Sequence, residues 1–287
     1  MQGIRCSLFH PRKTDMQGGD SMNQLPYELD FCHKFNIHKL LGLIMDDYDL
    51  KTIARIYGVK LRALKKIEKS FEDNIASCVK ELRAKLPQKK PLEKPVRILA
   101  IGDSLTSDRE SYMKMLKKLW EDDKSREIID CSISGDTTYD LINRFYASIL
   151  SEEYDWVTLL IGVNDAREPD DGSRVSNLSV GEYERNMKYL VESLLKRDKK
   201  LVLITLFQPD STRLKQEFPE NNWWYDKKRI EDANAVIRTL ANEHGIPVAE
   251  LGKKLAEADE DYLEPDGLHM NLSAHMALCE LLWDILP

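Results

Sequence analysis

The chain has 287 residues and a formal net charge of −7, with 42% hydrophobic and 32% charged residues. This is the composition of an ordinary globular protein, and it excludes wholesale disorder. Because a domain has roughly 150 residues, the length predicts two domains or one large one. No apolar run in the sequence approaches the roughly 20 residues of a membrane-spanning helix, and we expect no secretory signal.

Charge is distributed unevenly along the chain. Residues 1–50 carry 5 basic and 7 acidic side chains, residues 51–95 carry 13 and 5, and residues 96–287 carry 24 and 37. A basic segment in front of an acidic body indicates two units with different roles. The five cysteines are scattered and form no CxxC pair, which predicts reduced thiols in a cytoplasmic protein rather than a disulfide framework or a zinc site.

The N-terminal third predicts helices rather than a sheet. Residues 1–30 open with a polar stretch that shows no hydrophobic period, and they predict a flexible extension. Residues 31–92 predict a helical unit that ends in a linker rich in proline and lysine. Within that unit, apolar residues spaced by three and four predict helices over about residues 37–44, 50–57 and 61–86.

The helical unit weakly resembles a helix-turn-helix of DNA-binding regulators. Ala54, Gly58 and Leu64 stand where such a hairpin needs a small crossing residue, a turn and an apolar contact. The second helix would expose Lys60, Arg62, Lys65, Lys66 and Lys69, which suit phosphates. Two alternatives stay open: DNA binding through about residues 50–70, or a solvated helical appendage that packs on the second unit or pairs two chains.

After the linker, short apolar runs alternate with amphipathic segments. The runs cover residues 96–101, 128–133, 156–161, 201–207 and 247–251, and the segments cover about residues 112–120, 139–150, 180–195, 230–244 and 272–286. Apolar strands separated by helices predict an α/β fold whose parallel sheet is covered on both faces. Ligands bind such sheets beyond the carboxyl ends of the strands, so the residues after each run are the first candidates for chemistry.

A candidate nucleophile and base stand at two of these positions. Ser104 follows the first apolar run, where its hydroxyl could attack a carbonyl close to a helix N-terminus. Asp266 and His269 lie three residues apart in a glycine-containing turn, where the carboxylate could orient the imidazole that takes the serine proton. Taken singly, Ser104 could instead be a helix-capping residue, and the Asp266–His269 pair could be a loop salt bridge.

Two further residues are candidate donors to an oxyanion. Gly135 follows the second run, where a glycine lets the backbone N–H approach a bound group. Asn164 follows the third run and could aim its amide N–H at a developing negative charge. Each also suits an ordinary turn between a strand and a helix.

In chain order, these blocks resemble the SGNH hydrolases, the GDSL group of esterases and lipases. They read Gly102-Asp103-Ser104-Leu105, Gly135, Gly162-Val163-Asn164-Asp165 and Asp266-Gly267-Leu268-His269, and the resemblance covers about residues 95–287. It implies a flavodoxin-like α/β/α sandwich with five parallel strands over a domain of residues 93–287, and ester hydrolysis without a metal or other cofactor. It also implies that Ser104 is the nucleophile, His269 the general base and acid, and Asp266 its orienting partner. Ser104, Gly135 and Asn164 would then form the oxyanion hole.

The sequence leaves the choice among several small ester substrates open. Trp223 and Trp224 follow the fourth run, where exposed rings could stack on a sugar and favour carbohydrate deacetylation. The same rings could instead close the core under a long loop. Short acyl groups are expected, because neither the loop at 167–179 nor that at 208–229 has the long apolar surface typical of a lipase lid.

Two functions from different classes follow. The first is a serine esterase that acts on a small-molecule ester. The second is a regulator in which a hydrolase-like domain senses a ligand and the N-terminal helices bind DNA. The complete set of five site residues favours the enzyme, because a sensor has no need to keep it. The sequence predicts no oligomeric state.

Overall fold

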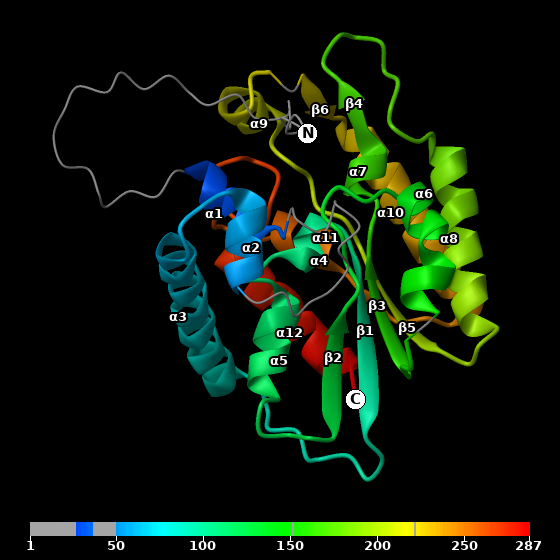
Figure 1. Ribbon diagram of the computed structural model, residues 1–287. Helices are drawn as coiled ribbons and strands as arrows, with labels where there is room; N and C mark the ends of the chain where they lie inside the picture. Colours follow the sequence, from blue (N-terminus) through cyan, green and yellow to red (C-terminus); the bar gives the residue numbers. More distant parts are fainter. Residues whose placement is uncertain (1–26, 37–49, 151, 221) are drawn as a thin grey trace, which may run out of the picture.

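The main sheet has five parallel strands, as predicted. The structure is a computed structural model that describes residues 27–36, 50–150, 152–220 and 222–287 (Figure 1). The strands are β1 (Val96–Gly102), β2 (Arg126–Asp130), β3 (Trp156–Leu160), β5 (Lys200–Ile204) and β7 (Val248–Ala249), in the order β2-β1-β3-β5-β7. Strand β1 is paired on both sides, with Ile98 opposite Ile128 and opposite Trp156. All five carboxyl ends therefore lie at one edge of the sheet.

Helices cover both faces of the sheet, which confirms the predicted α/β/α arrangement. One face carries α5 (Tyr112–Leu119) and α12 (Leu272–Ile285), with α3 (Leu61–Lys85) packed outside them (Figure 1). The other face carries α6 (Thr138–Asn143), α8 (Val180–Leu195) and α10 (Lys227–His244). Short elements fill the connections: α4 (Ser104–Ser107), the π-helix η2 (Phe145–Ile149), α7 (Val163–Ala166), α9 (Ser211–Glu217) and α11 (Leu251–Ala256).

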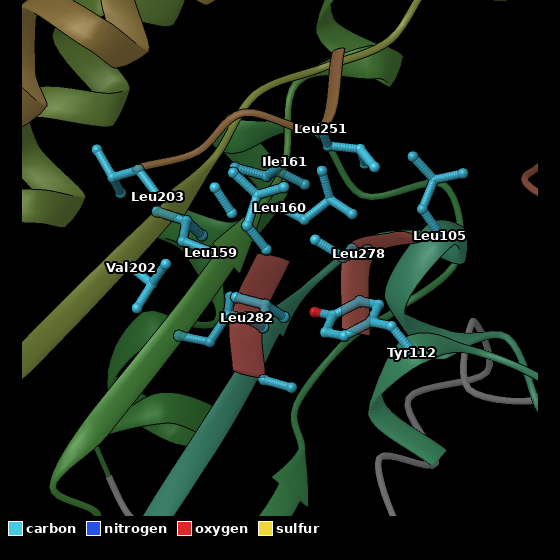
Figure 2. Close-up of a cluster of buried hydrophobic side chains, with 14 of the residues drawn as sticks. Leu105, Tyr112, Leu159, Leu160, Ile161, Val202, Leu203, Leu251, Leu278 and Leu282 are labelled. Carbon is cyan, nitrogen blue, oxygen red and sulfur yellow. The ribbon is translucent and has the colours of Figure 1, made fainter. Parts of the chain in front are cut away.

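The buried side chains between sheet and helices form one continuous cluster. Figure 2 shows Leu160 of β3, Leu278 and Leu282 of α12 and Tyr112 of α5 among these buried side chains. Such interdigitation of several layers at close-packed density holds the strand ends in fixed positions. Within the described residues, no helix is long and apolar enough to cross a membrane.

Some observed elements differ in detail from the predicted ones. Strand β2 begins at Arg126 and ends at Asp130, so the last residues of the predicted run belong to the turn that follows. The segment predicted over 139–150 is divided: α6 ends at Asn143, and the wider turn of η2 then buries both Phe145 and Ile149. A small antiparallel sheet of β4 (Arg167–Pro169) and β6 (Trp223–Tyr225) was not predicted, because three-residue strands carry no period.

The N-terminal helices pack against the α/β body. Helix α2 (Leu50–Tyr57) has the predicted bounds and α3 ends one residue earlier than predicted, with Gly58 between them at φ +68°. Helix α1 (Tyr27–Lys34) begins within the predicted extension of residues 1–30, and residues 1–26 lie outside the described part of the chain. The helix predicted over 37–44 lies outside the described residues.

Helix α3 belongs to two clusters of buried side chains. Its first half contributes Leu64, Ile67 and Phe71 to a small cluster with Ile53 of α2. Its second half contributes Leu82, with Cys78 and Val79, to the large cluster that contains the sheet. The helix therefore joins the N-terminal unit to the body through apolar packing.

We expect Leu82→Ala to lower the free energy of unfolding by about 2–5 kcal/mol, because it removes a fully buried side chain and leaves a cavity between α3 and the body. Urea denaturation measures the change, with Lys80→Ala, an exposed position of the same helix, as the control. Equal, small effects of the two substitutions would show that α3 does not contribute to the core.

Candidate active site

Ser104 lies where β1 ends and α4 begins. The Asp103 side chain caps α4 by accepting a hydrogen bond from the Leu105 N–H at 3.0 Å. This cap fixes the turn that presents Ser104, whose residue surface is 9% exposed. The Ser104 hydroxyl is thus held on a rigid turn at the carboxyl edge of the sheet.

The turn before α12 brings His269 to this hydroxyl. His269 Nε2 lies 2.9 Å from Ser104 Oγ, and His269 Nδ1 lies 2.6 Å from Asp266 Oδ2. The other Asp266 oxygen accepts hydrogen bonds from the backbone N–H groups of Leu268 and His269. The three predicted residues therefore form a chain of hydrogen bonds from carboxylate to imidazole to hydroxyl.

The pairing changes the protonation of both groups. Burial alone would lower the pKa of His269, but the Asp266 carboxylate outweighs it and raises the pKa above the ordinary 6.5. Burial would raise the pKa of Asp266, but His269 and the two backbone donors lower it to about 2. Asp266 is thus ionised throughout the range in which the imidazole titrates, and it stabilises an imidazolium.

The two candidate oxyanion donors lie on neighbouring turns. Gly135 follows β2 in a left-handed conformation with φ +85°, which other residues rarely adopt. The Asn164 amide donates to the Asp136 carbonyl oxygen at 3.1 Å and to Asp103 Oδ2 at 3.3 Å. The Asn164 side chain is thereby tied both to the turn that contains Gly135 and to the residue before Ser104.

Three buried aspartates, Asp103, Asp136 and Asp165, are hydrogen-bonded within and around these turns. Burial raises the pKa of Asp103 to about 7 and the pKa values of Asp136 and Asp165 to about 6. Asp165 accepts hydrogen bonds from the Thr138 N–H and hydroxyl, and Asp136 from Arg144. Each carboxylate therefore holds a neighbouring turn of the site. Among the described residues, no group of three or more His, Cys, Asp or Glu side chains could hold an ion.

The two predicted substrate contacts do not lie together. Trp223 belongs to a row of aromatic rings: it lies 6.4 Å from Phe218, Phe218 lies 5.7 Å from Phe31, and Phe31 lies 5.5 Å from His269. Trp224 lines a groove of about 580 Å³ beside α9. Neither Ser104 nor His269 lines that groove, so only Trp223 is connected to the site.

Sequence analysis missed the residues that reach the site from α1. Phe31 contacts the His269 ring edge-on, and Phe35 stacks on its face. Both belong to the sequence Asp-Phe-Cys-His-Lys-Phe-Asn at residues 30–36, which shows no helical or strand period. The one available signal was the pair of phenylalanines four residues apart, which places both on one side of a helix end.

The chain matches one family of known proteins, and solved structures share its fold. The model of the GDSL-like lipase/acylhydrolase family matches residues 100–277. No curated protein sequence matches the chain.

Among solved structures, a lipase/acylhydrolase from Enterococcus faecalis is similar, with 24% identity and a TM-score of 0.55 over 67% of this chain and 95% of that one. A catalytic mutant of the acetylxylan esterase Axe2 from Geobacillus stearothermophilus has 18% identity and a TM-score of 0.55 over 68% and 95%. The acetyl xylan esterase AlAXEase has 20% identity and a TM-score of 0.53 over 67% and 100%.

We expect the rate at which a fluorophosphonate labels Ser104 to rise with pH, with a midpoint above 6.5, because the neutral imidazole must accept the serine proton. Asp266→Asn should slow labelling by about 10⁴-fold and move the midpoint to lower pH, since the carboxylate that most strongly opposes the effect of burial on the His269 pKa is then absent.

Labelling followed by intact-protein mass spectrometry measures both effects. Asp261→Asn, an exposed aspartate near the same turn, is the control and should leave the profile unchanged. A pH-independent labelling rate would contradict the assignment of His269 as the base.

Proposed function

Because the chain belongs to the GDSL-like lipase/acylhydrolase family and is a carboxylic ester hydrolase, we propose that it cleaves small esters through Ser104, His269 and Asp266. The observation that carries this proposal is the unbroken hydrogen-bond chain from Asp266 to His269 to Ser104 Oγ. Ester hydrolysis needs an activated hydroxyl of this kind, and an isolated serine is a weak nucleophile.

The proposed reaction has two halves. Ser104 Oγ attacks the ester carbonyl carbon while His269 Nε2 takes the hydroxyl proton; the ester C–O bond then breaks, and His269 gives that proton to the departing alcohol. Water, activated by His269, attacks the acyl-Ser104 carbonyl and releases the acid and the free serine. The Asn164 amide and the backbone N–H groups of Ser104 and Gly135 stabilise the oxyanion of each tetrahedral intermediate.

Acetyl and other short acyl groups on a carbohydrate are the substrates we propose. Two of the similar structures are acetylxylan esterases, which makes acetylated sugars the first substrates to test. Trp223 supports this choice, since it is half-buried and its ring belongs to the aromatic row that leads to His269. A cytoplasmic location stays a prediction.

We expect hydrolysis of short acyl esters that Ser104→Ala abolishes and that Asn164→Ala slows by about 100-fold in kcat, because one oxyanion donor is removed. A panel of acyl esters, acetylated sugars and acyl thioesters, run on each variant, measures this. Ser70→Ala, an exposed serine on α3, should retain full activity. Absence of turnover on every ester, together with absence of fluorophosphonate labelling, would reject the proposed function.

DNA binding by the N-terminal helices is a second candidate function. The observation that favours it is that the basic side chains of the α2–α3 hairpin are exposed: Lys51, Arg55, Lys60, Arg62, Lys65, Lys66 and Lys69. The packing of α3 on the hydrolase core favours the alternative of a structural appendage. The two functions are not exclusive.

If the hairpin binds DNA, the full chain should bind duplex DNA with an affinity that falls as salt rises, because phosphate contacts release counterions. Replacing Lys65 and Lys66 together by Glu should weaken this binding. Replacing Lys253 and Lys254, which are exposed on α11, is the matched control. Fluorescence anisotropy at low and high salt measures both, and no binding at low salt would remove this candidate.

A further inference from the structure

Residues 31–36, at the end of α1, cross the candidate active site; we call them the crossing segment. The Phe35 ring is stacked on the His269 imidazole, with ring centroids 3.9 Å apart and an angle of 24° between the planes. The Phe31 ring contacts the same imidazole edge-on at 5.5 Å. Figure 1 shows α1 beside the loop that leads into α12.

The backbone of the crossing segment reaches the opposite side of the site. The Phe35 carbonyl oxygen accepts a hydrogen bond from the Ser134 hydroxyl, one residue before Gly135. The Ser107 hydroxyl donates to the same oxygen at 3.5 Å, and the Asn36 amide donates to the Ser107 carbonyl. Residue 35 thus extends from the imidazole to the turn that carries a candidate oxyanion donor.

Buried ionic contacts hold the crossing segment in place. The Lys34 ammonium pairs with Glu110 and lies 3.4 Å from both Asp108 and Glu264. Burial would lower the pKa of Lys34, but these three carboxylates raise it above its ordinary value. The Arg109 N–H also donates to the Lys34 carbonyl at 2.8 Å. A buried charge with three partners is costly to withdraw, so the crossing segment is a fixed wall and not a mobile lid.

The second anchor of the crossing segment lies on the N-terminal helices. His33 is fully buried and is hydrogen-bonded to Glu68 of α3, which also pairs with Arg109 at 2.9 Å. The Tyr57 hydroxyl of α2 donates to the Cys32 carbonyl at 2.8 Å. The N-terminal helices and the hydrolase body therefore both contact the crossing segment and hold it by hydrogen bonds and ion pairs.

This wall borders the space where the ester must react. The attacked carbonyl carbon must approach Ser104 Oγ to about 3–3.5 Å, with its oxygen toward Gly135 and Asn164. The groups on that carbon then lie beside residue 35, which reaches both His269 and the Gly135 turn. The exposed fractions are 9% for Ser104, 4% for His269 and 2% for Phe35, so little space surrounds the nucleophile.

Resting on the proposed function, we propose that Phe35 is a specificity-determining residue that limits the acyl group to short chains. Its ring occupies the volume next to the imidazole that a long acyl chain would need. The N-terminal helices thus serve the reaction directly, because they hold the residue that sets substrate size. The opposing possibility is a plug that blocks every ester equally, and the test below separates the two.

The test compares wild type, Phe35→Ala and Phe35→Leu on acetyl, butanoyl, hexanoyl and octanoyl esters with one common alcohol. We expect the octanoyl-to-acetyl ratio of kcat/KM to rise by about tenfold or more in Phe35→Ala, because lost ring volume admits the longer chain. Phe35→Leu should give a smaller rise. Tyr146→Ala, which removes an exposed aromatic ring outside the site, should leave the ratio unchanged.

Two controls and a second variant make the result decisive. Fluorophosphonate labelling of Ser104 and thermal melting establish that each variant is folded and active, and if Phe35→Ala does not fold, Phe35→Leu carries the test. An unchanged ratio, or an equal gain at every chain length, overturns the specificity role while leaving the proposed function intact. A wild type without turnover or labelling instead rejects the proposed function itself.

Discussion

The position of the His269 imidazole depends on two hydrogen bonds, 2.9 Å to Ser104 Oγ and 2.6 Å to Asp266 Oδ2. Ser104 and His269 are 165 residues apart in the chain. Their contact exists because a parallel sheet brings the end of β1 to the same edge as the turn that leads into α12. The layers of helices, the glycine turns and the buried aspartates all serve to keep this edge rigid.

The two buried carboxylates at that edge have opposite net pKa shifts, because their partners differ. Asp266 is ionised because it has an imidazole and two backbone donors as partners. Asp103 has weaker partners, and burial raises its pKa to about 7, although it stands beside the same serine. Asp266 therefore places a negative charge beside the imidazole, whereas Asp103 accepts a hydrogen bond from the Asn164 amide.

The sequence predicted the parts of this arrangement that repeat a strong pattern. Continuous apolar runs such as residues 96–101 and 156–161 predicted strands, and the α8 helix has its predicted bounds. The resemblance to SGNH hydrolases then identified Ser104, Asp266 and His269, which the structure brings within hydrogen-bond distance.

The contribution of α1 could not be predicted in the same way. Its role depends on tertiary contacts, such as the stacking of Phe35 on His269 and the pairing of Lys34 with Glu264, which leave no period in the sequence. Short strands such as β4 and β6 were missed for a similar reason, because three residues are too few to alternate visibly. Local sequence patterns predict the secondary structure of a segment, whereas its tertiary contacts depend on residues far away in the chain.

The Lys34–Glu264 contact has a consequence for how the protein is made. During synthesis from the N-terminus, Lys34 and Phe35 leave the ribosome long before the turn at residues 264–269. Until that turn is translated, Ser104 has no imidazole beside it and the Phe35 ring has no stacking partner. The proposed active site is therefore completed late, when the turn at 264–269 contacts residues 34 and 35.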